Sequence, residues 1–253
     1  MKLGIFIGKE EYKAVIMDVP VKDGVIYSLS SKDLSKVKEF ILPYKKNISS
    51  AGIFISDYYT EYFINEFKGA KDEDLPKLIK FKVKELSLYK EAVSVLGFQA
   101  INKVENLIKT VSAVTKGEVV KQAEELVEGL GIKDFTITAS SFPLLNLCKT
   151  GNFSLICSMD NTLTVFFGNQ QELTYVRKLK VGENSVFGIP ATFKYYRENF
   201  KDNIPDSVFT IGKNIELPEG IKEKTITINT LAKTKDNMKL DGFEILIGGL
   251  LNL

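Results

Sequence analysis

Short apolar segments separated by turn residues open the chain. Val, Ile, Leu, Phe and Tyr dominate three runs that Gly8 and Pro20 interrupt, which predicts a three-stranded meander. A stretch with helical apolar periodicity follows, with Ser31 or Asp33 available as N-cap, and then another run typical of a strand. The predicted strands are 3–7, 12–19, 24–29 and 51–55, and the predicted helix covers 34–41.

The same order of elements returns after residue 150. Three strands are predicted, then a helix with aromatic residues at Phe193, Tyr196 and Phe200, and then a further strand. This repeat in the order of elements, with little identity between the copies, indicates a duplicated unit. The elements of the second copy are strands at 153–158, 162–167 and 172–181, a helix at 190–200 and a strand at 207–211.

A middle segment with both helical and strand patterns separates the two copies. Thr115 and Glu118 have the spacing of a capping box, and the helix that they would open is expected to end at Gly129 or Gly131. These patterns therefore predict a small α+β insert. Its predicted helix is 75–85 and its strands are 93–98 and 106–114, after which we expect a strand at 135–138 and a helix at 142–148.

Composition excludes several classes of chemistry. The 253 residues include no His and no Trp, which excludes Ser-His-Asp catalysis and histidine metal sites. A net charge of +2, with Arg177 and Arg197 as the only arginines, gives no reason to expect nucleic acid. Cys148 and Cys157 lie in apolar surroundings, so we expect buried, inert thiols in a reducing, cytoplasmic compartment. No stretch reaches the roughly 20 apolar residues that a membrane span requires.

Three turns carry residues that could bind an anion or a metal. Gly8 and Lys9 lie in a glycine turn whose N–H groups could surround a phosphate, but the carboxylates of Glu10 and Glu11 favour an ordinary hairpin turn. Asp160 lies between two predicted strands and could hold Mg²⁺ through water, although Asp is also a common turn former. Gly212, at the end of a predicted strand, is a weaker signal of the same kind.

Two tyrosine clusters suit either a partner surface or the edge of a core. One contains Tyr58, Tyr59 and Tyr62, and the other contains Tyr195 and Tyr196. Because tyrosine combines apolar area with a polar tip, both interpretations are physically sound. The core-edge interpretation is favoured for both clusters.

Four stretches in order along the chain carry a family resemblance. They are 3–8 with 12–15, 129–135 with 142–145, 172–177 with Val181 and Gly182, and 243–251. The first resembles the opening motif LGIDIGSSSVKAV of the PilM family of type IV pilus assembly proteins, and the others are similar to later motifs of that family. The cytoplasmic domain of the GspL type II secretion proteins is related. The resemblance covers nearly the whole chain.

The resemblance implies the actin-like fold, an α/β fold made of two RNase H-like units. Subdomain I would comprise 1–68 and 135–150, and a small α+β subdomain would be inserted at 69–134. A reduced subdomain II would cover 151–242, and a C-terminal helix at 243–253 would return to subdomain I.

In this superfamily, ATP is held between the two halves by two phosphate hairpins. Phe6 stands where the first hairpin usually has a metal-organising Asp, and Cys157 stands near the second such Asp. We therefore expect a degenerate nucleotide site, with no cofactor, no metal and no enzymatic activity. The positions that the resemblance assigns to this cleft are Phe6, Gly8, Lys9, Cys157, Asp160, Gly182 and Gly212.

The function that the resemblance implies is a non-catalytic cytoplasmic scaffold in the inner-membrane platform of a type IV pilus or a type II secretion system. Its expected partners are the cytoplasmic tail of a membrane protein and the assembly ATPase. The tail would bind between the first half and the insert, with Tyr58 and Tyr59 as candidate contacts. The alternative is an ATP-dependent enzyme of actin-like or sugar-kinase-like type, since fold does not fix function. A membrane span following residue 253 is compatible with the glycine-rich segment 247–253.

Overall fold

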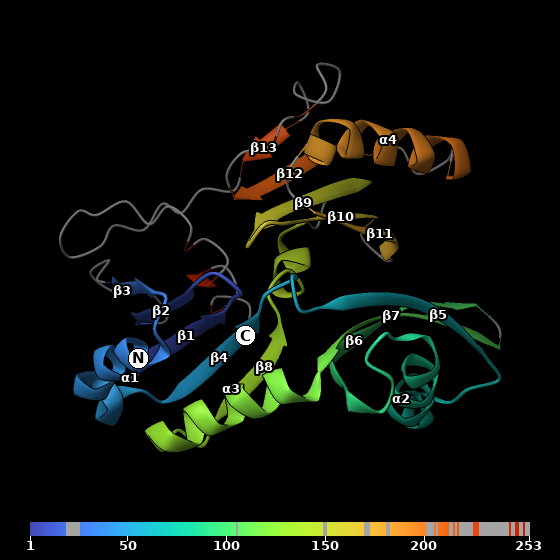
Figure 1. The fold of residues 1–253 in the computed structure, drawn as a ribbon. Helices are drawn as coiled ribbons and strands as arrows, with labels where there is room; N and C mark the ends of the chain where they lie inside the picture. Colours follow the sequence, from blue (N-terminus) through green and yellow to red (C-terminus); the bar gives the residue numbers. More distant parts are fainter. Residues whose placement is uncertain are drawn as a thin grey trace.

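The polypeptide folds into two halves, each built on a five-stranded sheet, with a smaller three-stranded sheet beside them (Figure 1). Each five-stranded sheet contains an antiparallel meander whose first strand also pairs in parallel with a later strand. The predicted duplication and the α/β fold class are therefore confirmed. The computed structural model describes residues 1–18, 26–104, 106–148, 151–169, 173–180, 183–200, 205, 207–212, 215, 217, 225–227, 243, 246–247 and 250.

Alternating apolar residues give the first sheet two buried faces. Leu3, Ile5 and Ile7 pack with the helices α1 (Leu34–Ile41) and α3 (Gly117–Leu130), whereas Phe6 packs on the opposite face with Leu250. Period-two burial of this kind fixes the register of the sheet. The strands, in the order β3-β2-β1-β4-β8, are β1 (Lys2–Ile7), β2 (Tyr12–Met17), β3 (Ile26–Ser31), β4 (Ser50–Ile55) and β8 (Phe135–Ala139), and α1 (Leu34–Ile41) is followed by η1 (Leu42–Asn47).

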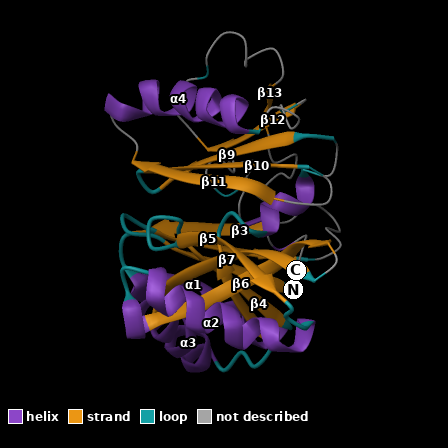
Figure 2. Cartoon of the chain, turned by 90° about the vertical axis from the view of Figure 1, so that its right-hand side faces the viewer, coloured by secondary structure: helices purple, strands orange, loops and turns teal. Residues whose placement is uncertain are grey.

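The second sheet packs α4 on its outer face, as Figure 2 shows. We predicted that this helix begins at Pro190, but it begins earlier and contains the proline. Ile189 is buried in the same core as Phe193 and Tyr196, and this burial offsets the cost of an interior proline. The strands, in the order β11-β10-β9-β12-β13, are β9 (Phe153–Met159), β10 (Thr162–Gly168), β11 (Leu173–Lys180), β12 (Ser207–Gly212) and β13 (Thr225–Thr227), and the helix is α4 (Glu183–Asn199).

The insert is a three-stranded antiparallel sheet, covered by α2 on one face and packed against the second half on the other. Its first strand lies before the expected boundary at 69, and α3, expected within 69–134, packs on the first sheet. The elements are β5 (Glu61–Lys68), η2 (Asp72–Asp74), α2 (Leu75–Leu86), η3 (Lys90–Ala92), β6 (Val93–Val104), β7 (Leu107–Lys116) and α3 (Gly117–Leu130), and the sheet order is β5-β7-β6.

Helix termini follow the sequence prediction in two of three cases. Asp33 caps α1, since its Oδ1 accepts a hydrogen bond from the Ser35 N–H at 2.8 Å. Gly131 ends α3 in the left-handed conformation, with φ of 69°. The capping box predicted at Thr115 does not form: the Thr115 hydroxyl instead donates to the Tyr59 carbonyl at 2.8 Å, and α3 has no side-chain N-cap.

The last described residues return to the first half. Residues 246, 247 and 250 are helical, and Leu246, Ile247 and Leu250 pack with Phe6 on the first sheet. The helix predicted at 142–148 is a short 3-10 helix, η4 (Pro143–Leu147).

Candidate functional site

Two equivalent hairpin turns, one from each half, meet between the halves. The Asp160 carboxylate, in the β9–β10 turn, accepts the Lys9 N–H at 2.5 Å through Oδ2 and the Glu10 N–H at 2.9 Å through Oδ1. We call this the inter-hairpin contact. Successive backbone N–H groups in a turn form a typical anion-binding site, and here the bound anion is the chain's own carboxylate.

Backbone geometry explains why these two turns can meet. In the β9–β10 turn, Asp160 and Asn161 have φ of 52° and 56°, the left-handed conformation of a two-residue hairpin that Asp and Asn tolerate. In the β1–β2 turn, the Gly8 N–H donates to the Glu11 carbonyl at 3.1 Å. A Cβ at Gly8 would lie 2.6 Å from Cε1 of Phe6 and 2.7 Å from that carbonyl, so only glycine fits.

Two of the other residues that the resemblance assigns to a nucleotide cleft, Phe6 and Cys157, are buried, whereas Gly212 is exposed. Phe6 is 2% exposed and lies in an apolar cluster. Cys157 is buried, and burial raises the pKa of its thiol well above the ordinary value. Gly212 has φ of 98° and is packed so closely on β9 that a Cβ would lie 2.0 Å from the Ser158 carbonyl oxygen. Gly182 lies outside the described residues.

A buried carboxylate forms a second polar centre where the three sheets meet. Asp57 is 3% exposed and follows β4. Its Oδ1 accepts the Tyr62 hydroxyl at 2.6 Å and the Ser140 hydroxyl at 3.1 Å, and its Oδ2 accepts the Ser141 hydroxyl at 2.5 Å. We call these four residues with Lys178 the junction network. The three hydroxyl donors satisfy the buried charge.

Lys178 connects the second half to this network. Its ammonium donates to the carbonyls of Asp57 at 3.0 Å, Tyr58 at 3.3 Å and Thr60 at 2.7 Å. Much of its side chain is exposed, but the ammonium group itself is surrounded by these carbonyls, and desolvation lowers its pKa. Sequence analysis did not identify Asp57 or Lys178, because neither lies in a recognisable motif.

Tyr58 and Tyr59 lie beside the inter-hairpin contact. Lys9 Nζ lies 4.7 Å from the centroid of the Tyr58 ring, and a hydrogen bond with Tyr58 is the main reason that the pKa of Lys9 is raised. The Tyr59 carbonyl accepts the hydroxyls of Thr115 and Tyr89. Both tyrosines are half-buried, and their side chains are partly accessible to a partner.

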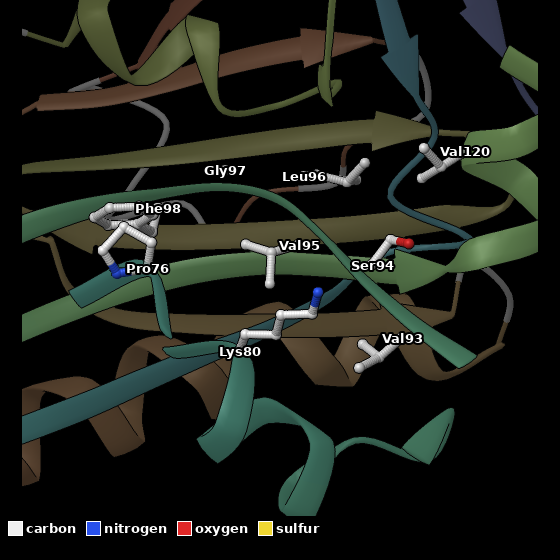
Figure 3. A pocket seen from close by; sticks show the side chains of 9 residues that line it. All are labelled: Pro76, Lys80, Val93, Ser94, Val95, Leu96, Gly97, Phe98 and Val120. Carbon is white, nitrogen blue, oxygen red and sulfur yellow. The ribbon is translucent and has the colours of Figure 1, made fainter. Parts of the chain in front are cut away.

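A groove of about 490 Å³ lies between the insert and α3 (Figure 3). Apolar side chains of β6 and the half-buried Val120 of α3 line it, and the exposed Lys80 of α2 extends along it. Tyr58 and Tyr59 are not among its lining residues. The lining residues are Pro76, Lys80, Val93, Ser94, Val95, Leu96, Gly97, Phe98 and Val120.

The groove runs along a sheet edge. β6 is an outer strand of its sheet, where it pairs with β7, and the register shifts at Leu96. Gly97 is half-buried, and an added Cβ would make only ordinary van der Waals contact with Phe142 at 3.5 Å. An edge strand offers N–H and C=O groups to an extended peptide, and this edge has apolar side chains around it. Sequence analysis placed a binding groove between the first half and the insert, but did not identify these residues.

The described residues contain neither a cluster of metal ligands nor a membrane-spanning helix. No group of three or more Cys, Asp or Glu side chains in this part of the chain could hold a metal ion. None of the described helices is long and apolar enough to cross a membrane.

Comparison with known proteins gives matches of structure. No family model and no curated protein matches the sequence. A chain of the PilM–PilN type IV pilus biogenesis complex has a TM-score of 0.72 at 12% identity, covering 99% of this chain and 97% of that one. The cytoplasmic domain of EpsL, an inner-membrane component of the Vibrio cholerae type II secretion system, has a TM-score of 0.66 at 10% identity, with 100% and 95% covered.

A third similar structure is of a protein with a known fold. A Bacteroides thetaiotaomicron protein with an actin-like ATPase fold has a TM-score of 0.56 at 10% identity, covering 97% of this chain and 95% of that one. Identities this low leave function open, but the similarity extends over both halves and the insert. This chain therefore has the actin-like fold that its sequence predicts.

Proposed function

We propose that this chain is a non-catalytic scaffold at the cytoplasmic face of the inner membrane, in the assembly platform of a type IV pilus or type II secretion system. In this role it binds the cytoplasmic segment of a membrane protein in the groove along β6. The observation that carries the proposal is the combination of a sheet edge with an apolar groove of about 490 Å³ beside it. The similarity to a PilM–PilN complex and to EpsL supports the setting.

The groove suits an extended apolar segment. A peptide added to the edge of β6 gains main-chain hydrogen bonds, and its alternate side chains contact Val95, Phe98 and Val120. Phe98 is 38% exposed at one end of the groove, as expected for an aromatic anchor. The Lys80 ammonium favours an acidic residue in the peptide.

The inter-hairpin contact supports a role without nucleotide. The N–H groups that the family resemblance assigns to a phosphate are used by Asp160, and Phe6 occupies the place of a carboxylate that would organise a metal. A triphosphate would have to displace one carboxylate and approach others at Glu10 and Glu11. The halves are thus held together by groups of the chain itself. An ATP-dependent enzyme is the competing function, and MgATP binding distinguishes the two.

A pair of phenylalanines on the insert gives a matched test of the groove. The probe is a fluorescently labelled extended peptide of apolar residues with one acidic residue, the chemistry that the groove fits, and its binding is measured by fluorescence anisotropy. Phe98→Ser should weaken binding at least tenfold, which corresponds to about 1.4 kcal/mol. Phe81→Ser, at an exposed position outside the groove lining, should leave binding unchanged. Equal effects of the two variants, or none, would contradict the proposal.

Tyr58 and Tyr59 are the competing prediction for the same contact. Replacing both with Ala should weaken peptide binding more than tenfold at an unchanged melting temperature if the partner docks beside the inter-hairpin contact. If the double variant weakens peptide binding while Phe98→Ser has no effect, the groove proposal is wrong and the peptide binds at the tyrosines. If the double variant unfolds early, the tyrosines are core-edge residues.

A further inference from the structure

The outer side of α2 forms a second surface on the insert. Leu75, Ile79 and Val83 are buried against the sheet, as in an ordinary amphipathic helix. Apolar residues also occur where water would be expected to meet polar side chains. Their exposed fractions are 36% for Leu78, 66% for Phe81, 49% for Leu86 and 87% for Leu88, which follows the helix. Isolated exposed apolar residues need no explanation, but Leu78 and Phe81 lie one turn apart on the same side of α2, and Leu86 and Leu88 follow at its C-terminal end. We call these four residues the α2 patch.

Lysines surround this patch. α2 carries four exposed lysines and a single acidic residue, Glu85, whose carboxylate lies 3.3 Å from Lys82 Nζ. The acidic residues of η2 (Asp72–Asp74) lie at the N-terminal end of the helix, whereas Leu86 and Leu88 lie at its C-terminal end. The C-terminal end of α2 is therefore both apolar and basic. The four lysines are Lys77, Lys80, Lys82 and Lys84.

We infer that the C-terminal end of α2 binds the surface of an anionic lipid bilayer. Lysine is depleted at protein–protein interfaces but is typical of the polar face of helices that lie in a membrane interface. The exposed apolar side chains here include phenylalanine and leucine, which such helices insert at the boundary between headgroups and acyl chains. This inference goes beyond the proposed scaffold role and does not depend on the peptide groove.

Charge determines the orientation of the bound protein. Phe81 and Leu88 enter the interface, and Lys82 and Lys84 lie beside the headgroups, while the acids of η2 stay away from the anionic surface. Four apolar side chains give weak, reversible binding. Such binding would add to the attachment that a membrane partner provides, because two linked contacts raise the effective concentration of each.

Cosedimentation with lipid vesicles tests the inference. The full chain should bind vesicles of 30% phosphatidylglycerol in phosphatidylcholine at least tenfold more tightly than pure phosphatidylcholine vesicles. Phe81→Ser with Leu88→Ser should lower binding at least tenfold, and Lys82→Gln with Lys84→Gln should abolish the preference for anionic lipid. Leu42→Ser, at a leucine of the first half that is 54% exposed, should change nothing.

Each of the other outcomes overturns the inference. If the wild-type protein does not bind anionic vesicles at 0.1 M salt, α2 does not contact lipid. The same conclusion follows if the Phe81→Ser, Leu88→Ser variant binds these vesicles as tightly as the wild type. If the same variant instead converts a dimer to a monomer in sedimentation equilibrium without lipid, the patch is an interface between copies. The anisotropy assay measures peptide binding in the groove without lipid. The peptide proposal and the lipid proposal can therefore fail independently of each other.

Discussion

The two halves have the same strand order, yet they contribute different chemical groups to the contacts between them. The second half contributes charged side chains, the carboxylate of Asp160 and the ammonium of Lys178. The first half contributes mainly backbone groups, the N–H groups of Lys9 and Glu10 and the carbonyls of the Asp57–Thr60 turn. Two copies of one unit have thus become complementary, because a side-chain charge on one copy meets oriented backbone dipoles on the other.

This difference has a consequence for mutation. A backbone donor or acceptor survives most substitutions of its own side chain, whereas Asp160 and Lys178 cannot be replaced without loss of the contact. Substitutions at the contact residues of the first half should therefore preserve these contacts, whereas substitutions of Asp160 or Lys178 should remove them. Asp57 is the exception in the first half, because its side chain holds the junction network.

Asp57→Ala should have the largest effect. It leaves the buried hydroxyls of Tyr62, Ser140 and Ser141 without this acceptor, which should cost about 3 kcal/mol and lower the melting temperature by roughly 6–12 °C. Asp134→Ala, at an exposed aspartate, is the control and should change stability by less than about 0.5 kcal/mol. Thermal unfolding by circular dichroism measures both. A similar small effect for the two variants would show that the junction network is not required.

Lys178→Met should cost about 2 kcal/mol, because the variant keeps the apolar stem but leaves three carbonyls without their charged donor. Lys180→Met, two residues further along the same strand and exposed, is the matched control. Urea unfolding should separate them. Equal midpoints for both variants would mean that Lys178 does not stabilise the contact between the halves.

Alkaline pH should destabilise the second half first. Burial raises the pKa of Cys148 to about 12 and that of Cys157 well above its ordinary value, and both thiols pack in the core that contains β9 and Phe209. A raised pKa means that the unfolded chain loses these protons first, so stability falls above pH 9 by at most about 1.4 kcal/mol per pH unit for each thiol.

Two measurements check this pH dependence. Hydrogen exchange should show earlier loss of protection in the second sheet than in the first as the pH rises from 9 to 11, and Cys148→Ala should reduce the slope. Native protein should also resist a thiol reagent at pH 8 that labels both cysteines after denaturation. Rapid labelling of Cys157 would contradict its burial.

Asp160→Gly, which keeps a residue that tolerates the φ of 52°, should have the smallest effect on stability, about 1 kcal/mol or less, since the turn is at the surface. Its local effect is larger: the amides of Lys9 and Glu10 should exchange with solvent at least tenfold faster by NMR. The Gly8 amide, which donates to the Glu11 carbonyl, is the internal control and should keep its rate. Unchanged exchange rates at all three amides would show that Asp160 does not hold the N–H groups of Lys9 and Glu10.

The sequence predicted the strands of both halves well because their apolar residues alternate or form short buried runs, as in 3–7 and 153–158. The boundary of the insert was less accurate, because nothing local in Glu61–Lys68 specifies that it pairs with β7 rather than with β4. The Thr115 capping box failed because Thr115 belongs to β7, where its hydroxyl donates to the Tyr59 carbonyl, and the N-cap position of α3 falls on Lys116.

The candidate site was predictable only in part. Asp160 and Lys9 were both identified as turn residues, but their contact joins positions 151 residues apart, and no local pattern encodes it. The junction network likewise depends on three sheets meeting at Asp57. The groove depends on β6 being an edge strand, which follows from the sheet order and not from its apolar sequence.

We propose that the Asp160 carboxylate occupies the place where the family resemblance expects a nucleotide phosphate. Isothermal titration calorimetry of the full chain with MgATP tests it most directly. The account predicts no heat of binding at millimolar nucleotide, because Asp160 holds the N–H groups of the turn and Phe6 cannot hold metal-bound water. A dissociation constant in the micromolar range for the wild-type chain would contradict it.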